Sequence, residues 1–180
     1  MSANSPLAWH PVPITAPIDI RWWLLHRDSL TRLIQQRCSQ FSVDPIFQSL
    51  APACNDELNI MNLRRDELAL VREVYLYCGD TPVVFAHSVV ARKHLQGAWR
   101  GLSRLGNRSL GTMLFSNPLI HRAEFGYKQL NSYHPLFKRA CQRLRAPPAN
   151  LWARRSRFTL EEQPILVTEV FLPAIRGLTI

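Results

Sequence analysis

The sequence predicts an α+β fold built on an antiparallel sheet. Two β-rich runs, 68–77 and 82–90, are separated by only four residues, Cys-Gly-Asp-Thr, which favour a turn. A second pair of runs, 151–160 and 164–172, is joined by Glu-Glu-Gln and closes the chain. Segments with apolar residues at helical spacing lie before and between these pairs. Strands joined as hairpins, with the helices set apart from them, are typical of an α+β architecture.

The other elements are recognised by capping and turn residues. Each expected helix begins at a residue that caps helices or ends at Gly, Asn or Pro. Together with the two hairpins these elements give about six strands. In chain order they are an extended arm over 1–17, a helix over 21–25 capped by Asp19, a helix from Asp28, a strand over 41–50 bent at Pro45, a loop over 51–60, a helix over 95–105, a short helix capped by Ser109, a strand over 119–130 and a surface helix over 134–144.

The chain length and composition predict one folded domain. The 180 residues match the usual size of a single domain, so we expect one domain over 1–180 with the arm at its start. A hydrophobic content of 47% excludes a disordered chain. No apolar run approaches the ~20 residues of a membrane span, and no basic leader precedes an apolar stretch. We therefore expect a cytoplasmic protein.

The cysteines and histidines predict neither a metal site nor a cofactor. Cys38, Cys54, Cys78 and Cys141 lie far apart, with no CxxC pair and no Cys/His pair at metal-ligand spacing. In a reducing cytoplasm they are expected to be free thiols. Glycine-rich phosphate loops and nucleophile motifs are also missing from the sequence.

The charge indicates an anionic partner. Residues 1–90 carry 7 basic and 9 acidic side chains, whereas residues 91–180 carry 15 basic and 4 acidic ones. The basic residues are 19 Arg and 3 Lys, and Arg is favoured where a carboxylate or phosphate is held at two points. Composition leaves open a nucleic acid, a membrane surface and a small polyanion or dicarboxylate. The sequence shows no recognition helix and no aromatic RNA-binding strand, which weakens the first.

Charged residues occur inside two otherwise apolar strand faces. Arg72 shares a strand face with Val74 and Leu76, and Glu169 shares one with Val167 and Phe171. A buried charge needs a partner. Arg72 and Glu169 could therefore form a structural ion pair with each other. Arg72 could also form a structural ion pair with a neighbour of Glu73. Alternatively, both line a buried site, in which Arg72 binds a ligand carboxylate and Glu169 meets a polar ligand atom.

A double arginine lies on the next-to-last strand. Arg154 shares a face with Trp152, Ser156 and Phe158, whereas Arg155 and Arg157 point to the other face. One interpretation of this run is a solvated basic edge that discourages strand pairing. The other interpretation is that one of the arginines binds a ligand.

Five motifs occur in an order that is specific, although each alone is weak. They are VREV (71–74), FAHSVV (85–90), LGNRSLG (105–111), LWARRS (151–156) and TEVFLP (168–173). With them the chain resembles the chorismate pyruvate-lyase family of ubiquinone biosynthesis from about Trp22 to Pro173. The resemblance implies a six-stranded antiparallel sheet with helical flaps enclosing a buried ligand. It also implies a monomer that splits chorismate into 4-hydroxybenzoate and pyruvate with no metal or cofactor.

The resemblance also implies roles for six residues, with Arg72 and Glu169 as the catalytic ones. By position, Arg72 holds the ring carboxylate, which the Leu110 backbone also contacts. Glu169 meets the ring oxygen that becomes the phenol, and Leu30 covers the ligand. Arg154 or Arg155 binds the enolpyruvyl carboxylate.

Two features depart from the family pattern. His87 stands where the family more often has an arginine, which would weaken a positive potential in the site at neutral pH unless His87 faces solvent. The segment 131–150 is longer than in short family members and is expected to be a peripheral helix without a catalytic role.

The alternative function is a non-catalytic, small-anion-binding module of the same fold, as in effector-sensing regulator domains, although the chain lacks the N-terminal winged helix of such regulators. No nucleic acid and no membrane insertion are expected, but the basic exterior could contact a membrane peripherally.

Overall fold

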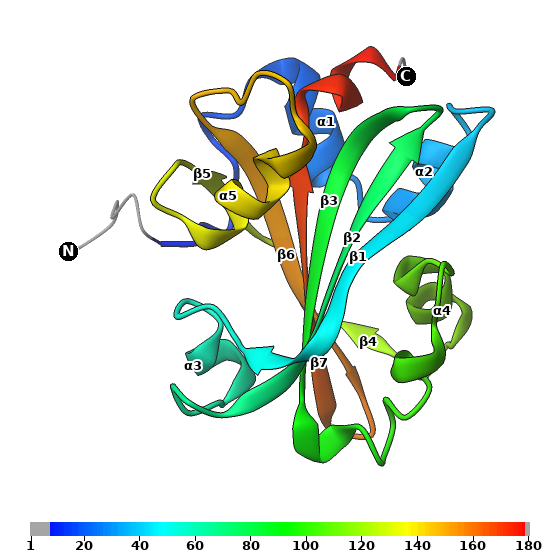
Figure 1. Cartoon of the computed structure of the whole chain (residues 1–180), viewed down its shortest axis with the longest axis vertical. Helices are drawn as coiled ribbons and strands as arrows, with labels where there is room; N and C mark the ends of the chain where they lie inside the picture. The colour runs from blue at the N-terminus through cyan, green and yellow to red at the C-terminus, as the bar shows by residue number, and fades with distance from the viewer. Residues whose placement is uncertain (1–7, 179–180) are drawn as a thin grey trace.

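One antiparallel sheet runs through the protein and carries short helices on both faces (Figure 1). The computed structural model describes residues 8–178. In the sheet the strands follow the order β1-β2-β3-β7-β6-β4, and β5 also pairs with β6. The strands are β1 (Phe41–Pro52), β2 (Leu68–Cys78), β3 (Thr81–Ala91), β4 (His121–Arg122), β5 (Gly126–Leu130), β6 (Leu151–Leu160) and β7 (Gln163–Phe171).

The predicted fold class and both hairpins are confirmed, but the sheet has seven strands instead of six. The expected strand 119–130 is broken into β4 and β5, which pair with opposite ends of β6. Residues 123–125 leave the regular ladder between them, although the Ala123 amide still donates to the Arg157 carbonyl at 2.8 Å. The predicted bend in the first strand is a register shift between Pro45 and Phe47.

Three helices cover one face of the sheet and two cover the other (Figure 1). On the first face, α1 packs on Val74 and Leu76, and α4 packs near Leu70 and Ile165. On the second face, α5 packs on Tyr75 and α3 packs lower down. The helices are α1 (Ile18–Leu25), α2 (Leu30–Gln35), α3 (Leu58–Met61), α4 (Leu110–Ser116) and α5 (Pro135–Ala140). Short 3-10 turns span Arg92–His94, Leu102–Arg104, Cys141–Arg143 and Pro173–Gly177. No helix among residues 8–178 is long and apolar enough to cross a membrane.

Three details of the predicted helices are wrong. Pro17 occupies the N-cap of α1, and Asp19 is the second residue of the helix, where its side chain accepts from the Ile20 amide. Ser29, not Asp28, caps α2 by accepting from the Arg32 amide. The segment 95–105 forms turns and a 3-10 helix instead of a regular helix, which fits its two glycines. The cap at Ser109 is confirmed.

The described part of the N-terminal arm lies along the edge of the sheet. His10 forms a bridge to Tyr127 of β5, with both backbone hydrogen bonds at 2.8 Å. Ala16 is buried against the core on the α1 side. Residues 1–7 of the predicted arm lie outside the described residues.

A disulfide overturns the expectation of four free thiols. Cys38, which follows α2, is bonded to Cys78 at the end of β2, while Cys54 and Cys141 are free and buried. The pairing follows from the sheet, because the register of β1 and β2 places Phe41 opposite Cys78. A separation of 40 residues hides this proximity from a search for short cysteine spacings.

The disulfide makes a prediction about stability. Closing a loop of 40 residues in the unfolded chain is expected to stabilise the fold by about 3–4 kcal/mol. Reduction, or the substitution Cys38→Ser, should lower the free energy of unfolding in urea by this amount, and Cys141→Ser is the control for loss of a buried thiol. Finding four reactive thiols in denatured, unreduced protein would contradict the pairing.

Candidate active site

A partly enclosed cavity lies on the first face of the sheet, between the two apolar clusters that hold α1 and α4. It is lined by side chains from the sheet, from α2 and from α4, and part of its space is open to solvent. The Thr31 and Ser109 hydroxyls lie 2.6 Å apart and join α2 to the start of α4 over this space. A Cβ on Gly111 would lie 3.1 Å from the Thr31 hydroxyl, so glycine permits this close approach of the two flaps. The helical flaps expected from the resemblance are therefore α2 and α4.

Arg72 of β2 points into the cavity with no carboxylate partner. It is 5% exposed, and its guanidinium donates to Gln48 Oε1 at 2.6 Å and to the Gly106 carbonyl at 2.7 Å. Its Nε has no hydrogen-bond partner, and no carboxylate among residues 8–178 lies within ion-pair distance. Burial lowers its pKa from the ordinary value of 12.5, so an anion placed here would be strongly favoured.

Glu169 of β7 faces the same cavity and is held by Arg154 of β6. The two residues are direct cross-strand partners, and Arg154 Nε donates to Glu169 Oε2 at 2.6 Å. Arg154 is 1% exposed and donates further to the Trp23 and Leu24 carbonyls at the end of α1. Glu169 Oε1 accepts no hydrogen bond from the described residues, so this oxygen is available to a ligand. The interpretation of Arg72 and Glu169 as an ion pair with each other is wrong, because Arg154 takes that place.

Leu30 and Leu110 also line the cavity. Leu30 begins α2 and is 3% exposed, and Leu110 begins α4 directly after its cap. Five of the six residues expected to bind the ligand are thus brought to one space by five different elements. The cavity is lined by Leu30, Arg72, Leu110, Arg154 and Glu169 among others.

Arg155 does not line the cavity, contrary to its inclusion among the substrate residues. Strand alternation turns it to the opposite face, where its guanidinium lies 4.3 Å from the centre of the Trp9 ring and donates to the Asp56 carbonyl. Asp56 also contacts Lys128 and His134 there. A solvated basic edge is wrong for this residue as well, because its side chain is only 12% exposed.

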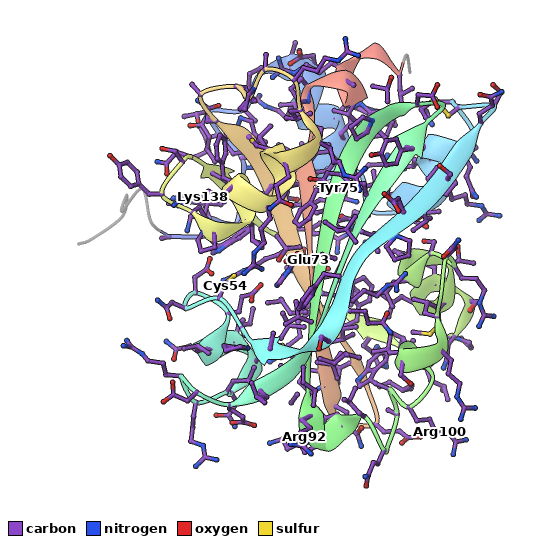
Figure 2. All side chains as sticks on the ribbon, in the orientation of Figure 1. Cys54, Glu73, Tyr75, Arg92, Arg100 and Lys138 are labelled. Atoms are coloured by element: carbon purple, nitrogen blue, oxygen red, sulfur yellow. A yellow bond between two sulfur atoms is a disulfide. The ribbon has the colours of Figure 1, made fainter. Side chains whose placement is uncertain are left out.

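His87 is fully buried behind the cavity. It projects to the opposite face of β3, where its imidazole is 2.9 Å from Glu73 and 3.2 Å from Glu57. Burial opposes its charge, but the two carboxylates outweigh burial and raise its pKa to about 9. Both expectations for His87 are therefore wrong: it does not face solvent, and it keeps a positive charge at neutral pH. Glu73 and Cys54 lie on this side of the sheet, between α3 and α5 (Figure 2).

Sequence reasoning missed Arg122 and Phe125, which also line the cavity. Both lie where the expected strand 119–130 breaks, and an irregular segment gives no alternation from which to assign a face. The only available signal was the presence of one more arginine in an apolar segment.

The cavity is lined by Arg72, Arg122 and Arg154 against an antiparallel sheet, and this charge suits a small anion. The family profile described as chorismate lyase matches residues 7–177. A relative from Nitrosomonas europaea, described as a probable chorismate pyruvate-lyase, is 69% identical over 99% of this chain and 100% of its own length. A relative from Thiobacillus denitrificans with the same description is 41% identical over 96% of this chain and 92% of its own length. The chain belongs to the chorismate lyase family and is a carbon–oxygen lyase.

Solved structures show the same fold in other proteins. The effector domain of PhnF from Mycobacterium smegmatis aligns with a TM-score of 0.55 at 9% identity, covering 83% of this chain and 91% of that one. The C-terminal domain of the histidine utilization repressor from Pseudomonas syringae aligns with a TM-score of 0.54 at 13% identity, covering 75% and 93%. These likenesses concern the fold alone. The family match places this chain with the enzymes and not with the non-catalytic alternative.

The buried His87 cluster predicts a pH-dependent stability. The folded pKa of about 9 lies above the ordinary 6.5, so this interaction stabilises the fold fully below about pH 6.5 and is lost as the pH rises through 9. His87→Gln leaves Glu57 without its buried cation, while Glu73 keeps Arg139, and should cost about 3–5 kcal/mol at neutral pH. His87→Arg, which keeps the charge, is the matched control.

Urea unfolding of the wild type and of His87→Gln at several pH values checks this prediction. The difference between the two free energies should shrink between pH 6.5 and 9. A difference that stays constant with pH would show that His87 does not carry a charge in the folded protein.

Proposed function

We propose that this enzyme cleaves chorismate to 4-hydroxybenzoate and pyruvate and thereby supplies the aromatic ring for ubiquinone biosynthesis. One observation carries the proposal. Arg72, a buried cation without a carboxylate partner, and Glu169, a carboxylate with one free oxygen, lie on the two strands that flank β3, two rungs apart, and face the same cavity. The family resemblance assigns the ring carboxylate to the first and the ring oxygen to the second.

The two side chains and the flaps fix the substrate in one orientation. Arg72 holds the ring carboxylate through its guanidinium, with the backbone of Leu110 beside it at the start of α4. Glu169 Oε1 accepts a hydrogen bond from the ring hydroxyl that becomes the phenol. Leu30 closes over the ring from α2, so that the apolar ring is enclosed by apolar side chains.

The reaction needs orientation more than activation. The bond between the ring carbon and the enolpyruvyl oxygen breaks, and the neighbouring ring carbon that carries the hydroxyl loses its proton. The electrons of that C–H bond complete the aromatic ring, and the enolpyruvate that leaves takes up a proton to become pyruvate. Aromatisation makes this elimination strongly downhill, and it involves no net electron transfer. The protein's contribution is to hold the substrate and to support the charge that develops on the leaving oxygen.

The exterior fits a small anionic substrate as well. We propose that the enzyme acts as a monomer, as the resemblance implies, that it acts in the cytoplasm, and that the whole chain forms one domain. Arg92 and Arg100 project from one end of the molecule (Figure 2) and belong to the basic second half of the chain. This surface would attract a dianion at low ionic strength and could touch an anionic membrane.

Turnover of chorismate tests the proposal directly. The purified protein should release pyruvate, followed with a coupled dehydrogenase, and 4-hydroxybenzoate, identified by chromatography against its 3-hydroxy isomer. The absence of both products would contradict the proposed reaction, and 3-hydroxybenzoate would contradict the assigned product.

Substitutions then test the two residues separately. Arg72→Gln should raise KM by about 30–100-fold, because a charge-assisted hydrogen bond contributes about 2–3 kcal/mol. Glu169→Gln should lower kcat by about 100-fold or more if the carboxylate handles charge in the transition state. Arg157→Gln, on the exposed side of β6, is the control and should leave both constants unchanged. Wild-type kinetics in Glu169→Gln would remove that residue from the reaction.

A further inference from the structure

Arg122 is a cation of the cavity that lacks a carboxylate partner. Its guanidinium carbon lies 4.5 Å from the centre of the Phe125 ring and 5.2 Å from that of Phe115. It donates to the backbone carbonyl of Arg27 in the connection between α1 and α2. Among residues 8–178 no carboxylate lies within ion-pair distance of it. The aromatic rings therefore hold the flat guanidinium in place without using up its N–H groups.

The cavity has an excess of two positive charges. Besides Asp28 and His87, the ionised side chains that line it are Arg72, Arg122, Arg154 and Glu169, which are three cations and one anion. Asp28 also borders the cavity, but its side chain is 79% exposed and pairs with His26. The imidazole of His87 projects to the other face, between its own two carboxylates. A ligand with two negative charges would balance this excess.

Arg154 is already committed to protein groups. Its Nε is bonded to Glu169, and its Nη1 donates to carbonyls at the end of α1. Its Nη2 alone has no partner among the described residues, so Arg154 could not hold a substrate carboxylate at two points without displacing a protein group. Arg122 has one backbone acceptor only, so an anion can be added there without breaking an ion pair.

The electrostatics favour the same conclusion. Burial and the nearby Arg154 lower the pKa of Arg122 from 12.5. The two guanidinium groups flank the same Phe125 ring, each with its central carbon 4.5 Å from the ring centre. A carboxylate beside Arg122 would relieve this repulsion between like charges.

We propose that Arg122 binds a second carboxylate of the substrate, so that Arg72 and Arg122 together select a dicarboxylate over a monocarboxylate. This inference rests on the proposed function, and it assigns the enolpyruvyl carboxylate to Arg122 in place of Arg154 or Arg155. Arg72 belongs to the sheet, whereas Arg122 contacts the flap connection, so the two carboxylates are held by different parts of the fold. The product 4-hydroxybenzoate has lost one carboxylate and no longer engages Arg122.

A comparison of two ligands tests the assignment. Arg122→Gln should raise KM for chorismate by about 30-fold or more and change the Kd for 4-hydroxybenzoate, measured by calorimetry, by less than about threefold. Arg122→Lys should show a smaller loss for chorismate, because one charged contact remains. Arg72→Gln should weaken both ligands, and Arg157→Gln should weaken neither. Equal weakening of both ligands in Arg122→Gln, or an unchanged KM, would overturn the proposal.

A second experiment separates this proposal from the proposed reaction. Wild-type protein is titrated with 3-(carboxymethoxy)benzoate, a dicarboxylate, and with benzoate. The dicarboxylate should bind at least about tenfold more tightly, and Arg122→Lys, chosen for its retained charge and folding, should reduce this preference. This outcome would support Arg122 even if chorismate were not turned over. A wild type that prefers neither ligand, or a preference unchanged in Arg122→Lys and Arg122→Gln, would contradict it.

Discussion

The buried pair of Arg154 and Glu169 is the interaction on which the site depends. Burying a guanidinium is costly, and here the cost is offset by a carboxylate and by carbonyls at the end of α1. The pair therefore joins the sheet, the Glu169 carboxylate and the end of α1 in one network. Removing Arg154 would leave Glu169 without its buried partner. It would also leave the carbonyl groups at the end of α1 without a hydrogen-bond donor. Glu169 owes its fixed position to a residue that need not touch the substrate.

The two faces of the sheet treat charge in opposite ways. On the face behind the cavity, the carboxylates of Glu57 and Glu73 are matched by His87 and Arg139, and hydrogen bonds from His134 and Trp9 overcome burial and lower the pKa of Asp56. On the cavity face, positive charge remains in excess. The charges on the face behind the cavity are thus balanced within the protein. The unpaired cations on the cavity face can be balanced by a bound anion.

Much of the fold and of the site could be predicted from the sequence, because both rest on strand alternation. That rule placed Arg72, Glu169 and Arg154 on cavity-facing positions, and it placed Arg155 on the opposite face even though the resemblance offered it as a ligand. Features that arise between distant segments were missed. The Cys38–Cys78 bond depends on strand register, and Arg122 lies where a strand breaks. The neighbours of His87 come from separate elements, so its charge could not be inferred from its own strand.

The edges of the sheet have a consequence for the behaviour of the protein at high concentration. Exposed strand edges invite other chains to add to a sheet, which leads to aggregation. Here the free edge of β1 is interrupted by the irregularity after Pro45, β4 has only two residues, and β5 is partly covered by the bridge from His10. A second copy of the chain meets edges that are broken, short or already paired, so growth of the sheet from one molecule to the next is disfavoured.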